Sequence, residues 1–93
     1  MGLPMLGVSV GCGPVLYSVH VRPAERAIEE ARQAGAEEHA PYEYFFAQAQ
    51  LEKAREEAGQ GDYQDAIGCA EQAEDFGVRA RNMARRYMRE SGR

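Results

Sequence analysis

Two stripes of mostly small residues, separated by a glycine turn, constrain the fold of this chain more than any other feature. Apolar residues recur at alternating spacings of three and four before the turn and again after it. Such spacing places each set on one face of an α-helix. The first stripe is Tyr44, Ala47, Leu51, Ala54 and Ala58, and the second is Tyr63, Ala66, Ala70, Ala73, Gly77, Ala80, Ala84 and Tyr87.

The turn between the stripes predicts that the two helices fold back on each other. Gly59 and Gly61 end the first helix, since glycine readily adopts the left-handed conformation found at helix ends. Asp62 is a good N-cap for the next helix, with Asp65 three residues on. Folding near residue 60 places bulky residues opposite small ones, in the pairs Tyr44 with Gly77, Leu51 with Ala70 and Ala58 with Tyr63.

A further helix is predicted ahead of this hairpin, over residues 23–38. Pro23 suits a first helical position, where its missing N–H costs no hydrogen bond. Gly35 weakens the helix and can end it, with residues 36–40 as a linker. Pro41 fixes the next boundary, because the residue before proline avoids the helical region. The apolar stripe of this helix is Ala24, Ala27, Ile28, Ala31 and Ala34.

The predicted fold class is therefore all-α, with helices over residues 23–38, 41–58 and 62–90. The chain forms either an antiparallel helical hairpin, broken at Pro41, or a three-helix bundle with an Ala-rich heptad seam. At 93 residues it makes one domain with a thin core. Cys12 lies in an apolar leader and Cys69 in a helix, so a disulfide framework is not expected.

The residue inventory predicts no enzyme and no cofactor. No nucleophile–base pair, phosphate loop or metal-ligand cluster is visible, so catalytic and metal-binding residues are both predicted to be absent. His20 and His39 each lack a second His or Cys at ligand spacing. Cys69 flanks the seam and is interpreted as a small, buried or half-buried hydrophobe.

The first eleven residues, MGLPMLGVSVG, are apolar, small and uncharged, and Cys12 follows them. An apolar core that ends in small residues is typical of a secretory signal at its cleavage site. Gly11 directly before Cys12 resembles a bacterial lipoprotein signal, which implies a lipid on the Cys12 thiol. Residues 1–11 would then be a leader and residues 12–22 a tether. No Lys or Arg precedes the apolar run, which a start upstream of Met1 would explain. The alternative is that residues 3–21 form an apolar tail or an edge strand.

Three segments carry a resemblance to a family of small bacterial envelope lipoproteins known only by a domain of unknown function. They are APYEY at residues 40–44, LEKAREEA at 51–58 and DYQDAIGCAEQAE at 62–74. The resemblance implies a helical domain anchored at the outer membrane, since Gly13 follows Cys12 where Asp would signal inner-membrane retention. Longer members carry the unit ahead of an outer-membrane-protein-A-like domain, and no such domain is recognised here.

The run GDYQDAIGCAEQA also resembles the turn and second helix of one tetratricopeptide repeat. The first-helix pattern of that family is not met, because Lys53 and Glu57 stand at its apolar positions. The second predicted helix is also longer than that repeat allows.

Two sets of residues are candidates for binding a partner. Tyr42, Phe45 and Phe46 form a second apolar stripe, which we expect the first helix to cover, with a partner protein as the alternative. The C-terminal end carries the candidates Arg79, Arg85, Arg86 and Arg89 around the stripe Ala80, Met83, Ala84, Tyr87 and Met88. Either the first helix covers this stripe, with Glu29 and Glu30 near the arginines, or the end projects and binds an anionic surface.

The resulting hypothesis is an outer-membrane-anchored lipoprotein whose helical domain is a periplasmic interaction or structural module. Its partners would be the membrane, through the lipid on Cys12, and an envelope protein, and no nucleic acid is expected. The alternative is a soluble helical adaptor that binds a protein or an anionic partner through its Arg-rich end.

Overall fold

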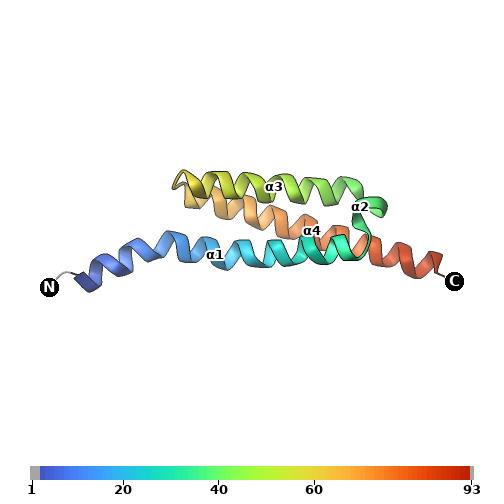
Figure 1. Ribbon diagram of the computed structural model, residues 1–93, viewed down its shortest axis with the longest axis horizontal. Coiled ribbons are helices and arrows are strands. Elements are labelled where there is room, and N and C mark those ends of the chain that lie inside the picture. The colour runs from blue at the N-terminus through green and yellow to red at the C-terminus, as the bar shows by residue number, and fades with distance from the viewer. Residues whose placement is uncertain (1–2, 93) are drawn as a thin grey trace.

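The computed structural model describes the backbone of residues 3–92 and the side chains of residues 13–92. It contains α1 (Leu3–Gln33), α2 (Ala36–His39), α3 (Pro41–Gly59) and α4 (Tyr63–Ser91), and no strand occurs within these residues (Figure 1). The predicted all-α class is confirmed.

The central helix of the structure is α4, which packs along both α1 and α3, whereas α1 and α3 touch each other less. The chain runs one way in α1, returns in α3 and runs forward again in α4, so α1 and α4 are parallel (Figure 1). The result is an elongated three-helix bundle of 67 × 19 × 14 Å. The alternative of a two-helix hairpin with a break at Pro41 is excluded.

Both predicted stripes lie in the core. The buried residues of α3 are Tyr44, Ala47, Leu51 and Ala54, and those of α4 are Ala66, Ala70, Ala73, Gly77, Ala80 and Ala84. Because most of these side chains are alanine or glycine, the helix backbones approach closely. The outermost members, Ala58, Tyr63 and Tyr87, are only half-buried or exposed.

The predicted start of the first helix at Pro23 is wrong. α1 begins at Leu3 and continues through Pro14 and Pro23, so residues 12–22 are helical and the edge strand proposed within residues 3–21 does not form. A proline inside a helix removes one hydrogen bond and costs about 3 kcal/mol. Val21 and Ala24, on either side of Pro23, are both buried in the core, and this packing offsets the cost.

The end of α1 also differs from the prediction. The helix stops at Gln33, because Gly35 adopts the left-handed conformation with φ of 88°. The expected linker of residues 36–40 is instead the single turn α2 followed by Ala40.

Gly77, predicted to lie opposite Tyr44, presents its Cα to α1. A Cβ atom at position 77 would lie 3.1 Å from Ala27 Cβ and 3.2 Å from the backbone nitrogen of Ile28. The absence of a side chain at Gly77 therefore lets α1 and α4 approach. α4 has two partner helices and not the single one that a hairpin implies, so its face at Gly77 is covered by α1.

We expect Gly77→Leu to destabilise the bundle by about 1–3 kcal/mol, because overpacking forces α1 away from α4. The matched control is Gly68→Leu in the same helix, where a Cβ would meet nothing within 4 Å. Urea denaturation of both variants measures the difference. Equal stability of the two variants would show that the Gly77 contact does not limit the packing.

Because Tyr44 is buried, we expect the free energy of unfolding to fall at alkaline pH. Burial, followed by the negative charge of Glu37, raises the pKa of its phenol above the ordinary value of 10.0. The folded state then holds this proton more tightly than the unfolded chain. Stability should be complete below pH 10 and decline as pH rises through the folded pKa.

Tyr44→Phe should reduce that decline, leaving the part that comes from Tyr17, whose pKa burial also raises. It should cost about 0.5–1.5 kcal/mol at neutral pH, because Gln48 Nε2 donates to the Tyr44 hydroxyl at 3.2 Å. Denaturation midpoints between pH 7 and 11 check both effects. Tyr42→Phe is the control, since Tyr42 is 67% exposed, and an equal flattening there would contradict the assignment to Tyr44.

Candidate functional site

Tyr42 and Phe46 contact Phe76 of α4, whereas the prediction was that α1 would cover them. The ring centroids of Phe46 and Phe76 are 4.4 Å apart, and Tyr42 stacks on Phe46 at 6.1 Å. We call Tyr42, Phe46 and Phe76 the aromatic cluster. Phe45 stays exposed, and its ring meets that of Tyr44 edge to face at 5.2 Å. The cluster forms on the solvent side of the α3–α4 seam because that seam is built from small residues.

Arg79 packs against the aromatic cluster and lies apart from the C-terminal arginines. Its guanidinium carbon lies 4.5 Å from the centroid of the Phe76 ring, a cation–π arrangement. Its Nη2 atom is also 2.9 Å from a carboxylate oxygen of Asp75, one turn earlier in α4. Phe76 was missed by the sequence analysis, although it directly precedes Gly77 in the stripe predicted to face Tyr44.

The end of α4 is partly covered, which agrees with the prediction that the first helix covers the C-terminal stripe. Ala80 and Ala84 are buried, and Arg81 Nη1 donates to Glu30 Oε1 of α1 at 2.7 Å. His39 of α2 stacks on Tyr87 with 4.0 Å between centroids. The other predicted acid, Glu29, pairs instead with Arg32 of its own helix.

The last turns of α4 nevertheless present an exposed basic surface. Met83, Tyr87 and Met88 are exposed. Arg85, Arg86 and Arg89 are also exposed, and within residues 13–92 none of the three lies within 4.0 Å of a carboxylate oxygen. From Arg79 to Arg89 the helix rises about 15 Å. The predicted partner-binding residues therefore form two separate surfaces.

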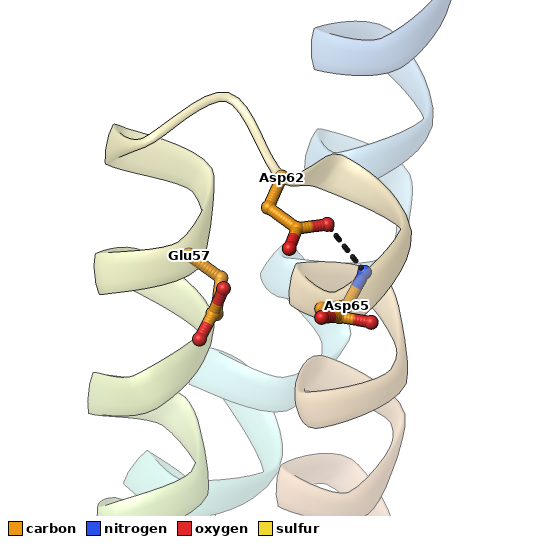
Figure 2. Close-up of side chains that lie close together, drawn as sticks. All are labelled: Glu57, Asp62 and Asp65. Atoms are coloured by element: carbon orange, nitrogen blue, oxygen red, sulfur yellow. Dashed lines mark hydrogen bonds between the residues drawn. The ribbon is translucent and has the colours of Figure 1, made fainter.

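A third group, unnoticed in the sequence, lies at the turn between α3 and α4. Glu57, Asp62 and Asp65 each place a carboxylate oxygen within 4.8 Å of the others (Figure 2). Asp62 caps α4 by accepting from the Asp65 backbone N–H at 3.4 Å. A hydrogen bond with the Asp62 carboxyl, followed by its charge, raises the pKa of the Asp65 carboxyl.

The cap accounts for the placement of Asp62 and Asp65 without a bound ion. Three ligand atoms also fall short of the six to eight oxygens that surround Ca²⁺. We therefore interpret Asp62 and Asp65 as the N-terminal cap of α4, with the Glu57 carboxylate beside them.

The two cysteines differ in what the structure says of them. The Cys12 backbone lies in α1, but its side chain is outside the described residues, so its predicted lipidation stays a prediction. Cys69 is half-buried and packs against the core, as expected of a small hydrophobe. Among the described helices, none is both long enough and apolar enough to cross a membrane.

A family model described as Domain of unknown function (DUF4398) matches residues 20–91. The chain belongs to this family. The match extends from the middle of α1 to the end of α4, so it covers nearly the whole bundle and begins after Cys12. The predicted membership of a family without an assigned function is confirmed at this level. Neither the comparison with curated proteins nor that with solved structures finds a match.

Truncation after Asn82 tests how much the end of α4 contributes to folding. It removes the buried Ala84 and the Tyr87 ring that stacks on His39. We expect a loss of about 1–2 kcal/mol, from one aromatic pair and one buried methyl group. That loss would lower the melting temperature by about 4–8 °C per kcal/mol.

A truncation after Glu90 is the control, and it should leave the melting temperature unchanged. If the longer truncation also left it unchanged, the end of α4 would contribute nothing to the bundle.

Proposed function

We propose that this chain is an outer-membrane-anchored lipoprotein whose helical bundle is a periplasmic interaction or structural module, without catalysis. One observation carries the proposal: Gly13, the residue directly after Cys12, already lies against the bundle. A Cβ at Gly13 would lie only 2.8 Å from the ring of Tyr63, the first residue of α4. The segment before Cys12 projects past the turn between α3 and α4 (Figure 1).

The division of the chain at Cys12 also supports the proposal. The family match starts at residue 20, which leaves the apolar leader outside the domain. Acyl chains on the Cys12 sulfur would hold the protein at a bilayer through about 0.8 kcal/mol for each buried CH₂ group, and more than one chain gives stable anchoring. Gly13 in place of Asp favours the outer membrane.

Anchoring at Cys12 would give the bundle a defined polarity. Gly13, next to Cys12, lies against Tyr63 at the start of α4, and the C-terminal end of α4 lies at the opposite end of the bundle (Figure 1). From Tyr63 to Arg89, α4 rises about 40 Å. The exposed arginines would then face away from the anchoring bilayer, where a periplasmic partner can reach them.

The second candidate function is a soluble adaptor that binds a protein or an anionic partner through the same end of α4. The exposed Arg85, Arg86 and Arg89, which lack carboxylate partners within the described side chains, favour this alternative.

Cys12→Ala separates the two functions. In a bacterial host grown with a palmitate analogue, the unaltered protein should be labelled and Cys12→Ala should not, because the thioether to the lipid forms on sulfur. Cys69→Ala is the matched control and should keep the label. Persistent labelling of Cys12→Ala would contradict the anchor and leave the soluble adaptor.

A further inference from the structure

A groove lies where α1 ends and α4 continues. It is lined by Glu30, Gln33 and Ala34 of α1 and by Arg85, Met88 and Arg89 of α4. We call these six residues the distal groove. It exists because Gly35 stops α1 while α4 extends further to Ser91 (Figure 1).

The floor of the distal groove is apolar and adaptable. Ala34 is half-buried, and Met88 is 53% exposed. Methionine is unbranched and flexible, so it can adjust its shape to different partners. Exposed Tyr87 extends the apolar surface beside the groove, while its ring rests on His39.

The charge of the distal groove is positive once existing ion pairs are counted. Its acid, Glu30, already accepts from Arg81 at 2.7 Å. Gln33 Nε2 donates to Glu29 at 3.1 Å, and Glu29 itself pairs with Arg32. Arg85 and Arg89 therefore keep charges that no carboxylate within the described side chains matches.

We propose that the distal groove binds a short acidic, amphipathic segment of a partner protein. Carboxylates of that segment would pair with Arg85 and Arg89, while its apolar side chains would pack on Met88 and Ala34. The two arginines are four residues apart, about 6 Å along the axis of α4. Glutamates at positions i and i+4 of a partner helix have the same spacing.

Two other occupants, a membrane surface and a second copy of the chain, fit the distal groove less well. This comparison rests on the proposed function, in which Cys12 is anchored at a bilayer. With Cys12 at the bilayer and the bundle upright on it, the distal groove would lie about 40 Å from that surface, far beyond the roughly 8–10 Å over which charges act in physiological salt. A second copy of the chain that offered its acidic group of Glu57, Asp62 and Asp65 would have to bring its α3–α4 turn to the groove. That turn would lie against the bilayer.

The test uses the purified full chain and a fluorescent peptide of roughly 12 residues, three helical turns. The peptide carries leucine on one face and glutamate on the other. Fluorescence anisotropy should show saturable binding that weakens as salt rises. A peptide with glutamine in place of glutamate should bind about tenfold more weakly or worse, because exposed charge pairs are lost.

Matched arginine variants locate the binding. The double variant Arg85→Glu with Arg89→Glu should also lose about tenfold or more in affinity, because two attractions become repulsions. Arg22→Glu with Arg26→Glu, at two exposed arginines of α1, should stay near the unaltered affinity. Met88→Ser should weaken binding with no change in salt dependence. Circular dichroism should show that every variant is folded.

Four outcomes would overturn the inference. They are equal losses in both arginine double variants, equal affinity for the glutamine peptide, preferential binding to phosphatidylglycerol vesicles through Arg85 and Arg89, and a dimer in sedimentation that depends on those arginines. The labelling of Cys12 is measured in cells and does not depend on the peptide. A negative result for peptide binding in the distal groove can therefore be told apart from a negative result for the lipid anchor on Cys12.

Discussion

The close approach of two helices to α4 is the interaction on which the rest of the structure depends. Ala70, Ala73, Ala80 and Ala84 have no exposed surface at all, yet each buries only one methyl group, worth about 0.8 kcal/mol. No single contact dominates, so stability accumulates along the length of the helix. The elongated shape, the thin core and the 29 residues of α4 all follow from this.

Polar contacts fix the alignment of α1 against its neighbours. Arg55 of α3 donates to Glu25 at 2.8 Å, and Arg81 of α4 donates to Glu30. The first pair is exposed, and such pairs contribute only about 0–1 kcal/mol, whereas the second is partly buried. These pairs set the register of α1 along α3 and α4. A seam of alanines would allow one helix to shift along another more easily than a seam of interlocking large side chains.

The sequence predicts the parts of this fold that local periodicity encodes. The two stripes and the Asp62 cap were found because helical spacing and cap chemistry repeat within a few residues. The start of α1 was not predicted, because local rules end a helix at Pro23. Burial of Val21 and Ala24 offsets the local cost of Pro23, and that burial depends on residues distant in the sequence.

The candidate surfaces divide in the same way. The exposed arginines are visible in the composition of the C-terminal end. By contrast, Phe76 in the aromatic cluster and the α1 residues of the distal groove require the three-dimensional choice of which helix faces which. A sequence pattern shows that a helix has a buried face, but not which of two neighbours covers it.

The position of Pro14 would have a different effect in a shorter form of the chain, one that begins at Cys12. Inside α1, Pro14 leaves the helical ladder without one N–H donor. In a polypeptide whose first residue is Cys12, the same proline would stand in the opening turn, where N–H groups have no helical acceptor in any case. In such a shorter polypeptide, the residue that interrupts the long helix would be a suitable helix initiator, with its fixed φ angle preorganised for helical geometry. Shortening the chain at that point would remove a fault from the helix while leaving the bundle contact at Gly13 in place.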